Sequence, residues 1–234
     1  MTPFCALAWG PGVVFNDPVH LDDAQIDRYS RQIVLSEVGP RGQLRLLAAR
    51  VGVLGTGVAV ERAIGYLAAA GVGRIAAAPA LRGALDPEQP DTAFEPLVAT
   101  TAGEVPAAAP PFDALLVVAP AAWPGPPARV ALWIAGGALG APPACPTCAG
   151  DDGATPVPPA LAPLRDALLG TVAATELVKA LLAIGTPLRG QVLRYDPAAA
   201  SVTVTATAPR AGCPTCRTLA AAAPDRPPAG GGAS

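Results

Sequence analysis

The chain has 234 residues, of which 51% are hydrophobic, 4% aromatic and 15% charged, and its formal net charge is −2. This length and apolar content allow one domain with a buried core. The charge balance leaves no basic surface, which argues against nucleic-acid binding. The basic residues are almost all arginine, and Lys179 is the only lysine.

Residues 1–20 are read as an N-terminal extension. It has no positively charged start, and proline and glycine interrupt it, which argues against a secretory signal. No run of about 18 apolar residues lacks charges and helix breakers, so we expect no membrane span and a cytoplasmic protein. Cys5 has no neighbouring cation, which favours a buried inert thiol over a persulfide carrier. His20 has no acid–base partner visible in the sequence, so we expect a structural or solvent-exposed role.

The next segments predict a helical pair followed by a βαβ unit. "LDDAQIDRYSRQIVL" (21–35) is typical of a helix with a solvated acidic start, since Asp22, Asp23 and Asp27 complement the helix dipole. "GQLRLLAAR" indicates a second helical piece. An apolar strand at 50–54, a Gly55-Thr56-Gly57 turn, a helix to about residue 70 and an apolar strand at 74–78 then follow.

The second half predicts more strands and one long helix. Residues 79–111 are rich in Pro, Ala and Thr and indicate a loop with at most one weak element. We predict buried strands at 112–120 and 129–137, and a helix at 163–185 that Gly185 and Pro187 end. Glu176 and Lys179 on this helix are most simply a surface ion pair.

The end of the chain predicts an edge hairpin and a disordered tail. "GQVLRYD" and "SVTVTATA" alternate as two paired strands do. Residues 219–234 are read as a disordered tail. The glycines there suggest a flexible end more than a carrier terminus, because Ala-Ser follows them.

The cysteines give the strongest chemical signal. "CPTC" occurs twice, with Cys145 and Cys148 in one copy and Cys213 and Cys216 in the other. Two such knuckles can complete the tetrahedral sulfur shell of a structural zinc ion. Two redox disulfides are the alternative, which reducing conditions in the cytosol disfavour.

These motifs, in their order along the chain, resemble the ThiF/MoeB/HesA family, the prokaryotic relatives of ubiquitin-activating enzymes. The resemblance rests on "RYSRQIVL", the Gly-x-Gly strand unit, "YLAAAGVGRI", "TELVKALL", "RYD" and the two Cys-x-x-Cys pairs, within residues 27–78 and 145–216. It implies a Rossmann-like α/β domain over 21–218, with a mostly parallel sheet flanked by helices and a C-terminal hairpin tied by a four-cysteine zinc site. It also implies a dimeric protein that uses ATP and Mg²⁺ to adenylate a ubiquitin-like sulfur carrier or a peptide.

The residues that would bind the nucleotide depart from the family pattern. Gly55 and Gly57 remain, but Val58 and Val60 replace two further loop glycines, and Pro79 and Leu81 replace the acids that bind ribose. Pro120 and Ala121 replace an Asp-Asn pair, and the phosphate-pairing lysine is missing. A charged hydrogen bond contributes about 1.5–3 kcal/mol, so several losses would weaken a micromolar ATP site by powers of ten.

The catalytic thiol is missing too, since residues 149–212 contain no cysteine. By resemblance, Arg28 of "RYSRQ" would reach the partner subunit's ATP, whereas a salt bridge to a local acid is the simpler alternative. We therefore expect a degenerate partner or scaffold subunit. A divergent adenylyltransferase and a peptide- or carrier-docking module stay open as alternatives. A homodimer or a heterodimer with an active paralogue would bury one apolar set on the first helix: Ile26, Tyr29, Ile33, Val34 and Leu35.

Overall fold

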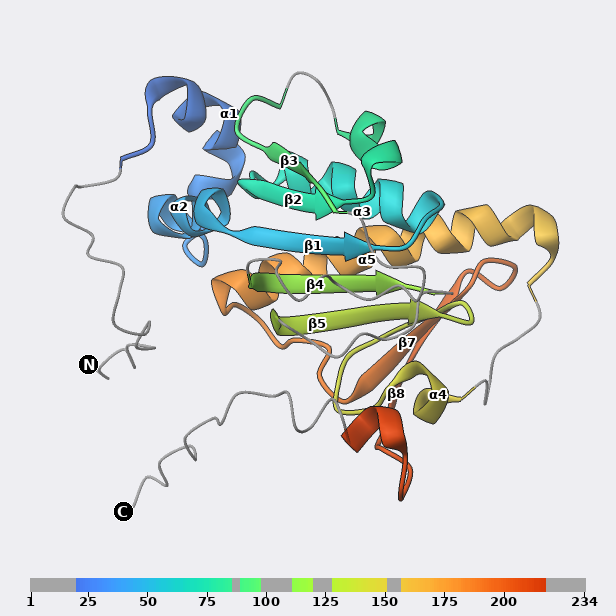
Figure 1. Ribbon diagram of the computed structural model, residues 1–234. Helices are drawn as coiled ribbons and strands as arrows, with labels where there is room; N and C mark the ends of the chain where they lie inside the picture. The colour runs from blue at the N-terminus through green and yellow to red at the C-terminus, as the bar shows by residue number, and fades with distance from the viewer. Residues whose placement is uncertain (1–19, 86–88, 98–110, 120–127, 151–156, 218–234) are drawn as a thin grey trace, which may run out of the picture.

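A computed structural model describes residues 20–85, 89–97, 111–119, 128–150 and 157–217. It has a single eight-stranded mixed sheet in the order β3-β2-β1-β4-β5-β6-β7-β8. The first five strands in that order are parallel, and the last three add in antiparallel fashion. The predicted α/β class, mostly parallel with a C-terminal hairpin, is therefore confirmed (Figure 1).

The predicted elements are present with small shifts at their ends. The helices and helical turns are α1 (Asp23–Ile33), α2 (Gly39–Ala48), α3 (Val58–Ala69), η1 (Pro79–Ala84), α4 (Pro146–Ala149), η2 (Pro159–Leu161) and α5 (Ala162–Leu182). The strands are β1 (Arg50–Leu54), β2 (Arg74–Ala77), β3 (Ala93–Pro96), β4 (Phe112–Val118), β5 (Ala128–Ala135), β6 (Ala138–Gly140), β7 (Gln191–Asp196) and β8 (Ser201–Ala206).

Helices α3 and α5 lie together on one face of the sheet, where they form the main core with the inward side chains of β1, β2 and β4 (Figure 1). Gly170 lets α5 approach the first turn of α3, because a Cβ there would collide with the Ala59 carbonyl oxygen. The central parallel strands β1 and β4 are buried along nearly their whole length and are apolar except for Arg50 and Asp113, as expected for the centre of an α/β sheet. None of the described helices is long and apolar enough to cross a membrane.

Three predicted details are wrong. The segment 79–111 contains the short helix η1 and also the edge strand β3, whose four residues are too few to show a period. Strand β6 is missing from the prediction. It follows the Gly136-Gly137 turn, where the chain reverses after β5, and its three residues are too few to show a period. Helix α5 ends at Leu182, before the predicted stop at Gly185. Its C-cap, Ala183, itself adopts the left-handed conformation (φ 58°, ψ 40°).

The start of α1 is more structured than a solvated acidic turn. Asp22 is the N-cap: its carboxylate accepts from the Gln25 backbone N–H at 2.8 Å, and the Gln25 side chain accepts from the Asp22 N–H. This capping box satisfies two backbone donors at the helix start. The extension 1–19 with Cys5, and the tail 218–234, lie outside the described residues.

Candidate functional site

The four cysteines come together, as predicted from the paired motif. The Sγ atoms of Cys145, Cys148, Cys213 and Cys216 all lie within 4.8 Å of one another, and the cysteines are not disulfide-bonded. Cys145 Sγ is 3.8 Å from Cys213 Sγ, and Cys148 Sγ is 3.5 Å from Cys216 Sγ. Sulfurs bound tetrahedrally at about 2.3 Å from a zinc ion are about 3.8 Å apart. The cluster can therefore hold a tetrahedral metal ion without a large rearrangement.

Backbone donors point at these sulfurs. The Cys145 N–H donates to Cys216 Sγ at 3.4 Å, and the Arg210 N–H donates to Cys148 Sγ at 3.3 Å. Such bonds stabilise thiolates, the form that ligates a metal. Burial raises the pKa of the Cys216 thiol to about 12, whereas a hydrogen bond from the Cys216 backbone lowers the pKa of Cys213 to about 6. A divalent cation is the physical way to hold all four as thiolates in so small a volume.

Two side chains that the motif does not reveal hold the first knuckle against the sheet. The buried Trp133 of β5 donates its indole Nε1–H to the Ala144 carbonyl at 3.1 Å, next to Cys145. Arg194 of β7 donates to the Gly150 carbonyl at 3.0 Å, just beyond α4. The cluster therefore joins the segment after β6 to the C-terminal hairpin.

The glycine loop, which the sequence predicts to be a degenerate nucleotide-binding turn, has positive φ at both of its glycines. Gly55 has φ +115°, and a Cβ there would lie 2.5 Å from the Val118 carbonyl oxygen of β4. Gly57, the N-cap of α3, has φ +95° and faces open space. Val60, at a position where the family pattern has glycine, is fully buried in the main core. Both remaining glycines are explained by backbone geometry.

The described side chains at the carboxyl ends of β2 and β5 lie as follows. After β2, Pro79 opens η1 and Leu81 is buried in the core, so neither offers an acid to a ribose. Arg82 stacks on the Phe94 ring, with 5.0 Å between the guanidinium carbon and the ring centroid. Arg165 covers the β5–β6 turn and pairs with Asp166 at 2.9 Å. Pro120 and Ala121 lie outside the described residues.

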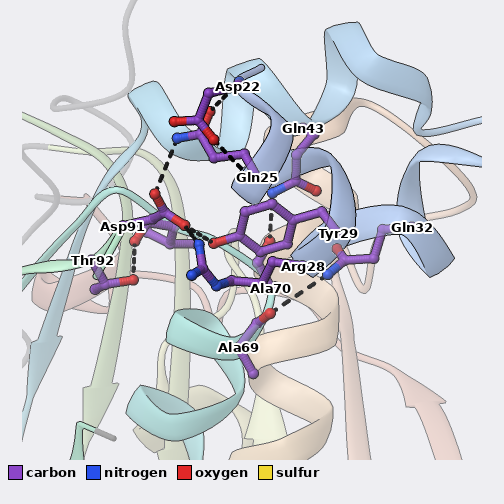
Figure 2. Close-up of polar contacts among 11 residues, drawn as sticks. Asp22, Gln25, Arg28, Tyr29, Gln32, Gln43, Ala69, Ala70, Asp91 and Thr92 are labelled. Atoms are coloured by element: carbon purple, nitrogen blue, oxygen red, sulfur yellow. Dashed lines mark hydrogen bonds and ion pairs between the residues drawn. The ribbon is translucent and has the colours of Figure 1, made fainter. Parts of the chain in front are cut away.

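Helix α1, which carries Arg28, lies at the other end of the parallel strands, where they begin (Figure 1). Arg28 forms an ion pair with Asp91, two residues before β3, which is the simpler of the two predicted alternatives. Asp91 also accepts from Gln25 Nε2 and from the Tyr29 hydroxyl, each at 3.0 Å (Figure 2). Burial disfavours the Asp91 carboxylate, but these hydrogen bonds and the Arg28 charge outweigh it and lower the Asp91 pKa.

Tyr29 is the centre of this amino-edge network and is not free for a partner. Its side chain is only 1% exposed, and its ring lies so close to Gly71 that a Cβ there would collide with it. Burial, followed by the Asp91 carboxylate, raises the Tyr29 pKa well above its usual range. The prediction that Tyr29 belongs to an open apolar face is therefore wrong. Ile26, Val34 and Leu35 of that set are exposed, at 41%, 77% and 51%.

The second arginine of "RYSRQ", Arg31, has no hydrogen bond or ion pair within the described residues, and it is exposed in the last turn of α1. The resemblance singles out Arg28 and not Arg31, and the sequence does not show that Arg28 is paired, because Asp91 is far away in the chain. Only the packing of α1 against the start of β3 shows that pairing.

The other polar residues that the sequence analysis named are Glu176, Lys179 and His20. Lys179 Nζ lies 2.6 Å from Glu176 Oε1, and Glu176 Oε2 accepts from the Leu188 N–H at 2.9 Å, so the pair also fixes the loop after α5. Both side chains are mostly buried, at 25% and 13% exposed, unlike a surface ion pair. His20 is exposed, in line with the prediction.

Known proteins share a short, highly similar segment with this chain. It is 58% identical over 55 residues to the SAMP-activating enzyme E1 of Haloferax volcanii, covering 24% of this chain and 20% of that protein. It is 51% identical over 51 residues to the sulfur carrier protein adenylyltransferase of Thermus thermophilus, covering 22% and 19%. The matched segments thus span about a fifth of these relatives. No family model matches the chain.

Solved structures share the fold over most of the chain. Escherichia coli MccB with ATP aligns with a TM-score of 0.58 at 14% identity, over 81% of this chain and 73% of that one. PaaA aligns with a TM-score of 0.58 at 12% identity, over 80% and 84%. The short similar segment and the shared fold both support the resemblance to the ThiF/MoeB family. The chain combines the α/β fold that it shares with MccB and a cluster of four cysteines that could hold a metal ion.

Proposed function

We propose that this ThiF/MoeB-family chain no longer adenylates a substrate by itself and acts as a partner subunit in the activation of a sulfur carrier or peptide. The observation that carries the proposal is the contrast at the carboxyl ends of the parallel strands. Gly55 and Gly57 have positive φ, while among the described residues after β2 Pro79 and Leu81 offer no acid to a ribose and Arg82 stacks on Phe94. Its relatives are named as carrier-activating adenylyltransferases, which supplies the substrate class.

A direct test is calorimetry of the purified chain with Mg²⁺ and ATP, together with ATP–pyrophosphate exchange. We expect neither binding at micromolar ATP nor exchange, because the charged partners that would hold the nucleotide are absent from the described edge. The T. thermophilus adenylyltransferase under the same conditions is a positive control. A micromolar dissociation constant for this chain would overturn the proposal and favour a divergent active enzyme.

The bound metal in this proposal is zinc. Four sulfur donors and no open position match a structural zinc site, in which the ion stabilises the fold without touching substrate. Cys145 and Cys148 would bind it from one side, and Cys213 and Cys216 from the other. We expect one zinc per chain by elemental analysis of protein purified without chelators. A folded protein with no metal would contradict this assignment.

A partner role requires a surface and a group to contribute. The exposed Ile26, Val34 and Leu35 of α1 are the apolar part of that surface. We propose that α1 packs on a second subunit, either another copy or an active paralogue, and presents a cation to the partner's phosphates. Arg31 has no ion pair with any residue that the structure describes, whereas Arg28 must first leave Asp91.

This trans contribution is tested by adenylation assays of the complex with an active paralogue. Arg31→Ala should lower the adenylation rate of the complex while the two chains still co-sediment. Arg28→Ala is the matched variant, and it should act mainly by loosening α1. If both variants leave the rate unchanged in an intact complex, the chain contributes only as a scaffold.

A further inference from the structure

The two edges of the sheet are protected very differently. Edge strand β3 has four residues, among them the charged Glu95 and Pro96, which lacks an N–H. Such features prevent another strand from pairing with an edge. Edge strand β8 has six residues, "SVTVTA", with no charge and no proline, and each of them is exposed. Strand β8 is therefore an open template for a further strand.

The apolar face of the sheet continues onto β8, where none of the described helices covers it. Val202 and Val204 pair with Tyr195 and Leu193 of β7, whose side chains pack partly against the main core. Val202 and Val204 themselves are 54% and 50% exposed. Valine favours a pleated, half-buried surface, so this edge strand has the composition of an inner one.

The alternation of hydrogen-bonded pairs in the β7–β8 hairpin shows which backbone N–H and C=O groups of β8 face away from the sheet. The Thr207 N–H donates to the Gly190 carbonyl at 2.9 Å, so residues 207 and 190 form a hydrogen-bonded pair. In an antiparallel ladder such pairs alternate along the strand. The backbone groups of Thr205 and Thr203 therefore point to β7, and those of Val204 and Val202 point away from the sheet.

We propose that β8 pairs with β8 of a second copy in antiparallel fashion across a two-fold axis, with Val202 opposite Val204 and Thr203 opposite itself. In this register the outward backbone N–H and C=O groups of Val202 in one copy form hydrogen bonds with those of Val204 in the other. The sequence from Ser201 to Thr205 reads hydroxyl, Val, Thr, Val, hydroxyl in either direction. An antiparallel partner reads in reverse, so the strand is complementary to itself.

This pairing joins two eight-stranded sheets into one of sixteen strands and makes a row of four valines. It uses a different surface from the α1 face, so both contacts can form in the same assembly. Two isologous contacts on one chain build a closed tetramer or an open chain of subunits. The β8 contact is expected whether or not the chain binds ATP or a paralogue.

The test combines charge-paired variants with sedimentation velocity at up to several hundred micromolar protein. Val202→Lys with Val204→Lys places like charges opposite each other at both positions and should weaken self-association by at least about tenfold. Val202→Glu with Val204→Lys places opposite charges together in the same register and should restore it. Val34→Glu in the same background removes the α1 contact, and unchanged zinc content and melting temperature show that each variant is folded.

Cysteine cross-linking fixes the register. Directly opposed residues of a non-hydrogen-bonded pair have Cα atoms about 4.5 Å apart, within disulfide range. Thr203→Cys should therefore cross-link to itself under mild oxidation, whereas Val204→Cys and the unmodified chain should not. Absence of β8-dependent association in the Val34→Glu background would overturn the proposal. A dimer that the two lysines do not weaken, or one that cross-links through residue 204, would overturn it too.

Discussion

The cysteine cluster and the glycine loop lie in one domain, yet they differ in what they keep. The cluster keeps every donor atom that a tetrahedral metal needs, with sulfurs at suitable separations. The loop has positive φ at Gly55 and Gly57, but among the described residues after β2, Pro79 opens a helical turn and Leu81 is buried in the core. The difference teaches that the backbone shape of a site and the side chains around it are set by separate residues.

The largest effect is expected at the cysteine cluster. Cys148→Ser removes one of four sulfur ligands and should abolish metal binding and native folding of the C-terminal hairpin. Structural zinc contributes an apparent 10–16 kcal/mol, roughly a whole domain's stability. Elemental analysis and thermal unfolding measure both losses, and Cys5→Ser is the matched control, since Cys5 belongs to neither Cys-Pro-Thr-Cys motif. A Cys148→Ser protein with wild-type melting would mean that the cluster has no structural role.

The next effect tests whether the glycine loop is held by geometry alone. Gly55→Ala places a Cβ near the Val118 carbonyl and forces alanine into φ +115°, so we expect a loss of about 3 kcal/mol or more. Gly57→Ala suffers only the strained φ and should lose about 1–2 kcal/mol. Gly83→Ala, in open space, is the neutral control. Urea unfolding of the three variants gives the order, and equal losses at 55 and 57 would contradict this reading.

The third effect concerns the side-chain network around Asp91 that joins α1 to the start of β3. Asp91→Ala removes the acceptor shared by Gln25, Arg28 and the buried Tyr29 hydroxyl, so we expect a loss of about 1–3 kcal/mol. Asp23→Ala is the control, since Asp23 is an exposed carboxylate in the first turn of α1. Urea unfolding at pH 7 measures the difference.

The pH dependence of that loss follows from the Asp91 pKa. The folded-state pKa is lowered, so the contribution is fully present above the unfolded pKa of about 3.9. It disappears as the pH falls through the lower folded value. The stability gap between wild type and Asp91→Asn should stay constant from pH 7 to about pH 5 and shrink below about pH 4. A gap that does not change down to pH 2 would show that the charge of Asp91 is unimportant.

Features set by residues close in sequence were predictable, whereas features set by contacts between distant segments were not. The βαβ unit, α5, the hairpin and the four ligands follow from local periodicity and from the repeated Cys-Pro-Thr-Cys. Strand β3 and the Arg28–Asp91 pair were out of reach, because both depend on where a proline-rich segment returns to the sheet. Trp133 and Arg194 support the cysteine knuckle from strands that carry no motif.

The smallest effect is a predicted gain in stability, the opposite of the losses expected at Gly55 and Gly57. Helix α5 ends with Ala183 at φ 58°, a conformation that costs an alanine about 1 kcal/mol and glycine almost nothing. Glycine loses more entropy on folding, which offsets part of the gain. Ala183→Gly should therefore stabilise the protein by up to about 1 kcal/mol, seen as a small rise in melting temperature. Gly185→Ala, at φ +62°, should lower it. Changes in melting temperature of opposite sign at residues 183 and 185 would show that positive φ sets the residue preference here, as it does at Gly55. A lower melting temperature for Ala183→Gly would mean that the Ala183 methyl group makes a packing contact worth more than its strain.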